Sequence, residues 1–394
     1  MEDITKNQTL LSINLDQVPK ENEDGTEIEI IDSSLRYMEK PFDPTKINIE
    51  TKTPSLDTLI KRIERGSVQL NTESYFQRKD DLWDKEKQSR LIESILIQFP
   101  LPAFFFDATD DNNWLVVDGL QRLSSIRNFV VDKTLKLTNL EFLNQLNGKS
   151  WNDLPGDLQR IIEEAQVVIY KIMPGTPTEV KFNIFKRINT GGLVLEAQEI
   201  RHALFQGKPS EFIYELANIK EFTEATNNKI KKDRMLDRDF ANRFLCFYLL
   251  GVENYGKEGF GRDLDTFMSR AMASISNKTE IELKKIKTDF IESMKLAHSI
   301  FGKEAFRKIH FESQKLPPIN KALFDAISVQ FALINENDRI GLRENKKEFK
   351  IMLFQTLRND EVFFTSVSSS TGDRNRVLYR HNKIKELINI TLFL

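Results

Sequence analysis

The chain has few of the residues that build disulfides and metal centres. Its 394 residues include one cysteine, Cys246, and four histidines. A single thiol excludes an internal disulfide, and so few sulfur and imidazole ligands argue against a Cys/His zinc site. The histidines are also scattered along the chain. We therefore do not expect a His-Asn-His nuclease centre, which needs several histidines close together.

Long apolar runs and a strong excess of one charge are missing as well. The 57 Lys and Arg nearly balance the 59 Asp and Glu, for a formal net charge of −2. The protein therefore has no overall basic field that would indicate nucleic-acid binding. A local basic groove is compatible with this balance of charges. No stretch approaches the roughly 20 apolar residues of a membrane span, and the polar first residues do not resemble a signal peptide. We expect a cytoplasmic protein that does not bind membranes.

The length predicts two domains, since a single core rarely grows this large. We expect the α+β class: a polar N-terminal arm at 1–45, an α/β domain at 46–206 and an all-helical domain at 207–394. Strand-like segments occur only in the middle part, whereas apolar residues recur with helical spacing after residue 209. The strands are predicted at 103–107, 114–117 and 167–173, and the helices at 55–64, 85–98, 124–131, 158–165, 178–188, 196–206, 234–250, 264–275, 280–301, 319–334, 346–357 and 374–390.

The most informative segment is Asp118-Gly119-Leu120-Gln121-Arg122. It follows an apolar run and precedes a helical segment, which places an acid at the end of a strand and the glycine at the turn. The glutamine and arginine then fall in the first turn of a helix, where free N–H groups and the helix dipole favour an anion. Arg122 would fork onto phosphate oxygens, and Asp118 would hold a metal ion. The alternative, about equally frequent for so short a pattern, is a strand-to-helix turn without a ligand.

A second segment, Phe76-Gln77-Arg78, combines an aromatic anchor with two polar groups. Such a loop could pack its ring into a core and direct the amide and guanidinium at a ligand. An isolated tripeptide of this kind is more often a solvated surface turn.

A third segment follows the predicted helix 178–188. Arg187 supplies positive charge, and the glycines of Asn189-Thr190-Gly191-Gly192 permit positive φ, so that successive N–H groups could form an anion nest. The ordinary alternative is a glycine helix terminator. In the next predicted helix, Glu199 and Arg201 are either polar site groups or part of an exposed helical face.

Together and in this order, these motifs resemble the ParB-like DGQQR-motif family, which forms the N-terminal, GmrS-type domain of GmrSD-type modification-dependent restriction endonucleases. The resemblance covers about half of the chain. It departs from the family pattern at Leu120, where the family has a second glutamine, and in the lack of a counterpart of the C-terminal HNH nuclease half. The matching segments are Phe76–Arg78, Ile92–Ile95, Phe99–Pro102, Val117–Ser124, Phe185–Gly192 and Gln198–Arg201.

The resemblance implies a ParB/sulfiredoxin-like α/β core with a helical extension, and a nucleotide-binding, nucleotide-hydrolysing protein of DNA restriction or antiviral defence. The implied ligands are a nucleoside triphosphate and Mg²⁺, with DNA and a partner effector or nuclease as further candidates. The catalytic residues would be Asp118, which also binds the metal, Gln121 and Arg122. The nucleotide-binding residues would be Gln77, Arg78, Gly119, Arg187, Asn189, Thr190, Gly191, Gly192, Glu199 and Arg201.

Two alternatives to an NTP hydrolase stay open. In the first, the site binds nucleotide or DNA without chemistry and the helical half recruits an effector. In the second, the ParB-like core is itself a metal-dependent DNA nuclease. Plasmid nicking, phosphate release and ligand-dependent thermal stabilisation distinguish the three.

Overall fold

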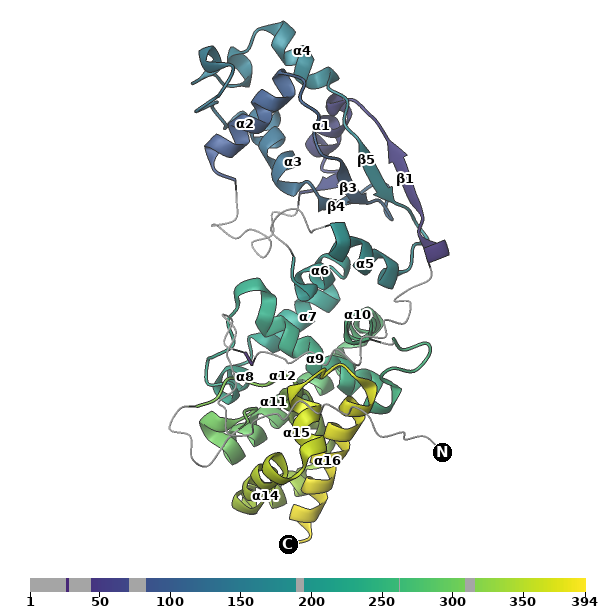
Figure 1. Cartoon of the computed structure of the whole chain (residues 1–394). Helices are drawn as coiled ribbons and strands as arrows, with labels where there is room; N and C mark the ends of the chain where they lie inside the picture. Colours follow the sequence, from purple (N-terminus) through teal and green to yellow (C-terminus); the bar gives the residue numbers. More distant parts are fainter. Residues whose placement is uncertain (1–25, 28–43, 71–82, 189–194, 262, 309–315) are drawn as a thin grey trace, which may run out of the picture. The chain divides into compact units, whose positions relative to one another are not determined.

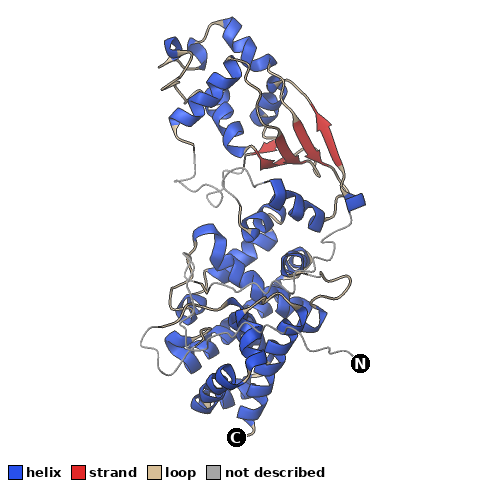
Figure 2. Ribbon diagram, viewed as in Figure 1, coloured by secondary structure: helices blue, strands red, loops and turns tan. Residues whose placement is uncertain are grey.

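The computed structural model describes residues 26–27, 44–70, 83–188, 195–261, 263–308 and 316–394 (Figure 1). These residues form two units, an α/β unit at 40–204 and a helical unit at 205–394 that also includes the first 39 residues. All strands of the described chain belong to the α/β unit, and the helical unit is built from helices (Figure 2). The predicted α+β class and the helical second half are confirmed.

The α/β unit is organised around a five-stranded mixed sheet with the order β1-β5-β3-β4-β2. β3 and β4 form an antiparallel hairpin, while β3–β5 and β4–β2 are parallel and β1–β5 is antiparallel. The strands are β1 (Ile49–Lys52), β2 (Val68–Gln69), β3 (Phe104–Asp107), β4 (Trp114–Asp118) and β5 (Ile169–Ile172).

Helices pack on both faces of this sheet, where its central strands carry apolar residues on both sides (Figure 1). Phe104, Phe106 and Trp114 face a core shared with α1 to α4. Val117 and Ile172 face a smaller core shared with α5 and α6. The helices are α1 (Leu56–Glu64), α2 (Lys85–Leu96), α3 (Leu120–Ile126), α4 (Gly156–Glu164), α5 (Thr178–Ile188) and α6 (Ala197–Leu204); α3 continues as a π-helical turn at Arg127–Val131, with short 3-10 turns at Pro44–Lys46, Asn144–Leu146 and Trp151–Asp153.

The helical unit has a phenylalanine-rich core. The rings of Phe240 and Phe306 each lie with their centroids 4.9 Å from that of Phe324 on α12. Its helices are α7 (Lys208–Ala217), α8 (Lys220–Ala225), α9 (Leu236–Leu250), α10 (Leu264–Ile275), α11 (Glu280–Phe301), α12 (Lys321–Leu333), α13 (Glu336–Glu344), α14 (Lys346–Asn359), α15 (Glu361–Ser368) and α16 (Arg374–Leu392), with 3-10 turns at Asp233–Met235, Val252–Asn254 and Gly302–Glu304.

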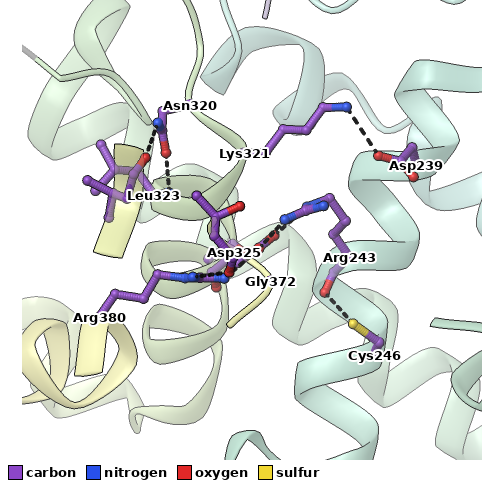
Figure 3. Close-up of polar contacts among 12 residues, drawn as sticks. Asp239, Arg243, Cys246, Asn320, Lys321, Leu323, Asp325, Gly372 and Arg380 are labelled. Atoms are coloured by element: carbon purple, nitrogen blue, oxygen red, sulfur yellow. Dashed lines mark hydrogen bonds and ion pairs between the residues drawn. The ribbon is translucent and has the colours of Figure 1, made fainter. Parts of the chain in front are cut away.

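A buried ion cluster connects α9, α12 and α16 inside this core (Figure 3). The Arg243 guanidinium donates through Nε and Nη2 to the two oxygens of Asp325, at 2.8 and 2.6 Å. Arg380 Nη2 lies 3.4 Å from the same carboxylate, and Arg380 Nη1 donates to the carbonyl oxygens of Ser366 and Thr371. Burial lowers the pKa of Arg243, but the Asp325 charge outweighs it, so this pKa lies above its ordinary value.

Glu93 organises the connector between α3 and α4 in the α/β unit. Its side chain is buried, and its two oxygens accept hydrogen bonds from the backbone N–H groups of Glu141, Phe142 and Leu143, at 2.8 to 3.0 Å. Burial raises the pKa of Glu93, but the three N–H donors outweigh it, and the net shift is downward. The charged carboxylate therefore bonds the backbone N–H groups of 141–143, which a helix or strand would otherwise satisfy.

Replacing Glu93 by Gln should lower the free energy of unfolding of the α/β unit by about 2 kcal/mol at neutral pH, since bonds to a charged acceptor are stronger than bonds to a neutral one. Because the folded-state pKa is depressed, this contribution is present above the unfolded pKa of about 4.5 and disappears as the pH falls through the folded value. Urea unfolding of wild type and Glu93→Gln across this range should converge at acid pH. A constant difference would contradict the assignment.

Candidate functional site

The predicted strand–turn–helix arrangement is present at 114–126. β4 ends at Asp118, Gly119 makes the turn with φ +98°, and α3 begins at Leu120. A Cβ on Gly119 would lie 2.4 Å from Cδ1 of Phe104, which is completely buried on the neighbouring strand β3. Both the backbone conformation and the close approach to Phe104 therefore require glycine here. This brings Asp118, Gly119, Gln121 and Arg122 into one turn.

Arg122 points into the protein rather than toward solvent. Its Nη2 donates to the Asp118 carboxylate at 2.9 Å and to the Ala103 carbonyl at 3.1 Å, and Nη1 donates to the Pro102 carbonyl. The guanidinium carbon also lies 4.5 Å from the centroid of the Phe104 ring. Burial lowers the pKa of Arg122, and the adjacent Asp118 charge opposes that shift. These contacts join the start of β3, the end of β4 and the first turn of α3.

Asp118 is the accessible member of this pair. Its side chain is 38% exposed, against 10% for Arg122. Oδ2 accepts from Arg122, while Oδ1 has no hydrogen-bond partner within the described part of the chain. Asp118 and Arg122 are four residues apart, which is the usual spacing of ion pairs along a helix. The sequence spacing alone could therefore have indicated this ion pair. The result is a carboxylate held in a fixed orientation with one oxygen available.

Gln121, three residues after Asp118, contacts the segment before α2. Its Oε1 accepts a hydrogen bond from the backbone N–H of Trp83 at 3.2 Å, and the Trp83 carbonyl accepts from Gln88 at 2.7 Å. Trp83 is the first described residue after 71–82, so Gln77 and Arg78 lie outside the described residues. Nothing in the sequence pattern indicates Trp83 as a partner of the motif.

The second half of the predicted site lies on α5 and α6. Arg187 is exposed near the C-terminal end of α5, while Glu199 and Arg201 on α6 are buried. Glu199 accepts from the Glu196 N–H at 2.7 Å, and Arg201 Nε donates to Gln198 at 2.8 Å. The exposed helical face that we considered for these two residues is therefore wrong, because both side chains pack into the unit. Asn189, Thr190, Gly191 and Gly192 lie outside the described residues.

The two halves of the site share strand β4. Val117, which precedes Asp118, packs in the same apolar cluster as Phe185 of α5 and Ile200 of α6. α5 is also tied to β3 by the Lys181–Asp107 ion pair, 2.8 Å long and nearly buried. Helices α5 and α6 are thus anchored to the strand that carries the Asp118 turn.

Across the residues that the structure describes, no three His, Cys, Asp or Glu side chains gather into a group that could hold a metal ion. Asp118 therefore does not belong to such a group within the described residues. In the same described ranges, no helix is both long and apolar enough to cross a membrane.

Comparison with protein families identifies the α/β unit. Residues 56–206 match the family model of the GmrSD restriction endonuclease, N-terminal domain. The match covers 151 of the 394 residues and assigns this segment, which we call the GmrSD N-terminal domain. This match bears out the family resemblance of the motifs and connects the domain with restriction of DNA. Neither a curated protein nor a solved structure matches the chain.

Replacing Gly119 by Ala in the GmrSD N-terminal domain should destabilise it by more than about 1 kcal/mol, because the new Cβ meets Phe104 and the backbone is in the left-handed region. Gly156→Ala is the matched control, since a Cβ there meets nothing within 4 Å and the position lies in the first turn of α4. Thermal melting of the three proteins checks this. Equal losses in both variants would argue against the tight turn.

Proposed function

We propose that the GmrSD N-terminal domain binds a nucleoside triphosphate with Mg²⁺ at the Asp118 turn and hydrolyses it, as part of a restriction or antiviral defence system. The observation that carries the proposal is the half-exposed Asp118 carboxylate, held by Arg122 at a strand-to-helix turn. Asp and Gly at the end of a strand, with Gln and Arg in the following helix, supply an oxygen ligand, a close backbone approach and polar groups in one place.

The donor set of the turn fits Mg²⁺ in a particular way. Mg²⁺ sites commonly use one or two carboxylates and take their remaining ligands from phosphate oxygens and water. Asp118 offers one carboxylate oxygen, but the Arg122 charge beside it offsets much of the attraction for a free cation. Asp118 would therefore hold the ion jointly with the nucleotide phosphates, and the bound ion would neutralise phosphate charge during transfer.

The structure changes the role that we propose for Arg122. Its donors are directed at Asp118 and at the carbonyl oxygens of Pro102 and Ala103, so we assign it to positioning Asp118 rather than to contacting phosphate. Gln121, fixed through Trp83, would orient the attacking water. Positive charge for the phosphates would come from Arg78 and the exposed Arg187. The remaining proposed nucleotide-binding residues are Gln77, Gly119, Asn189, Thr190, Gly191 and Gly192. Glu199 and Arg201 are buried on α6, so their proposed part in the site is to position it.

A binding module without catalysis is the second candidate. It is favoured by the inward orientation of Arg122, because the arginine nearest to Asp118 is engaged in structural contacts instead of stabilising transition-state charge. In that case the site would bind nucleotide or DNA, and a partner effector or nuclease would act. The hydrolase and the module differ in phosphate release alone.

The decisive experiment compares Asp118→Asn with wild type in thermal melts against the four ribonucleoside triphosphates with Mg²⁺, with phosphate release measured on the same samples. Asparagine keeps the shape of the side chain but removes the charge that compensates the buried Arg122 guanidinium, so the unliganded melting temperature should fall, and the ligand-induced rise should be lost. Turnover should fall at least 100-fold. Asp157→Asn, on the exposed surface of α4, is the control.

Arg122→Met separates positioning from phosphate contact. We expect it to lower the melting temperature without ligand, because it leaves two backbone carbonyls and Asp118 without their donor. A normal unliganded melt with nucleotide binding lost would instead place Arg122 on the phosphates. If Asp118→Asn binds and hydrolyses nucleotide like wild type, the proposal is wrong.

Metal and nucleotide should also bind interdependently. Because Arg122 already neutralises Asp118, Mg²⁺ alone at millimolar concentration should leave the melting temperature unchanged, whereas Mg²⁺ with nucleotide should raise it more than nucleotide with a chelator. A shift with Mg²⁺ alone would indicate further protein ligands. Calorimetric titration of nucleotide with and without Mg²⁺ provides the corresponding affinities.

A further inference from the structure

The side chain of Glu27 is buried in the helical unit, with 6% of its surface exposed. Thr26 pairs with Ile319 in a parallel β-bridge, and the Glu27 N–H donates to the Ile319 carbonyl at 3.0 Å. On its other side, Ile319 pairs with Arg307 in an antiparallel bridge. Residues 26–27 therefore pair with the edge of a short bridged segment in the helical unit. An extended peptide binds in the same way when it adds a strand to a protein.

Within the described ranges, three residues make the polar site that the Glu27 side chain fills. One carboxylate oxygen is paired with Lys308 Nζ, and the other accepts from Asn320 Nδ2 at 3.0 Å. Lys308 also donates to Ser368 Oγ at 2.9 Å, and its ammonium lies 4.8 Å from the centroid of the Phe364 ring. Lys308, Asn320 and Ser368 are all at most 4% exposed. We name these three residues the Glu27 site.

The site is held in place independently of Glu27. Asn320 caps α12 by accepting from the Leu323 N–H at 2.8 Å (Figure 3), and its Nδ2 also donates to the Val367 carbonyl at 2.6 Å. Ser368 belongs to α15 and bonds the Phe364 carbonyl at 2.7 Å. The donors that meet the carboxylate are thus oriented by two helices. A buried ammonium is costly without an opposite charge, so an anionic occupant stabilises the site.

We propose that the Glu27 site is a recognition site for a glutamate on an extended peptide segment, which the chain's own residues 26–27 occupy. The backbone bond to Ile319 selects an extended segment, and the two side-chain donors select a carboxylate. Because each oxygen meets a different donor, the fit depends on the length of glutamate. Aspartate, shorter by one methylene, would not reach both Lys308 and Asn320.

The test uses the full-length Glu27→Ala variant and a fluorescent peptide with the sequence of residues 20–34. Polarisation should show binding to Glu27→Ala and at least ten-fold weaker binding to wild type, whose tethered segment competes at an effective concentration on the order of mM. Binding to Glu27→Ala/Lys308→Met should be at least ten-fold weaker than to Glu27→Ala. Glu27→Ala/Lys347→Met, which removes an exposed lysine instead, should bind like Glu27→Ala.

Two control peptides test the selectivity. Glu27→Gln and Glu27→Asp peptides retain the five other acidic residues of the segment, Glu21, Glu23, Asp24, Glu29 and Asp32. Both should bind at least ten-fold more weakly if the site reads this carboxylate. Equal binding of all peptides would reduce the interaction to general charge attraction and overturn the proposal, as would no binding to a folded Glu27→Ala protein.

A second measurement applies if Glu27→Ala does not fold. Hydrogen exchange of full-length Glu27→Gln should show faster exchange of the amide of residue 27 than in wild type, with α9 and α12 equally protected in both. Unchanged protection of this amide would overturn the proposal, because the segment would then be held without the carboxylate.

Discussion

The Arg122 guanidinium is the contact on which the geometry of the candidate site depends. It is bonded to the end of β4 and to the two residues that lead into β3, while its own backbone begins α3. Gly119 makes the contact possible, because a larger residue would separate α3 from Phe104. Burial of the Arg122 charge thus holds the Asp118 carboxylate in a fixed orientation at the surface of the domain. Positioning of this kind is what phosphoryl chemistry requires of a protein.

Both units use buried charges where regular structure ends. Glu93 binds three consecutive N–H groups of a connector, and Arg380 binds the carbonyls of Ser366 and Thr371 around the turn between α15 and α16. In each case an ionised side chain satisfies backbone groups that have no helix or strand to bond with. Such contacts fix the course of a loop more sharply than apolar packing does, since a misplaced loop would leave the charge unsolvated.

Much of the fold follows from the sequence, because apolar periodicity is strong in it. The helices at 264–275 and 280–301 were predicted at their exact limits, and the β3–β4 hairpin was predicted from two apolar runs around an Asp/Asn-rich turn. β1 was missed because its four residues lie at a sheet edge and are mostly exposed, and β2 because it has two residues. Helices α7, α8, α13 and α15, which are 6 to 10 residues long, were also missed.

The candidate site was predictable in place but not in orientation. The motif indicated which residues share the turn, since strand, glycine and helix follow each other in the sequence. The motif did not indicate that Arg122 points inward. The acceptors of Arg122 are the carbonyl oxygens of Pro102 and Ala103, and residue types do not reveal which backbone carbonyl accepts a hydrogen bond. For the same reason, the backbone N–H of Trp83 could not be foreseen as the partner of Gln121.

The docking of Glu27 has a consequence for the order in which the protein is made. Glu27 and its partner Asn320 are separated by 293 residues, so at 5–20 residues per second roughly 15 to 60 s pass between their synthesis. The α/β unit, made from 40–204, is complete well before then. Glu27 is therefore synthesised well before the residues that hold it, and the helical unit can pack around Glu27 only after the α/β unit that lies between them in the sequence has had time to fold.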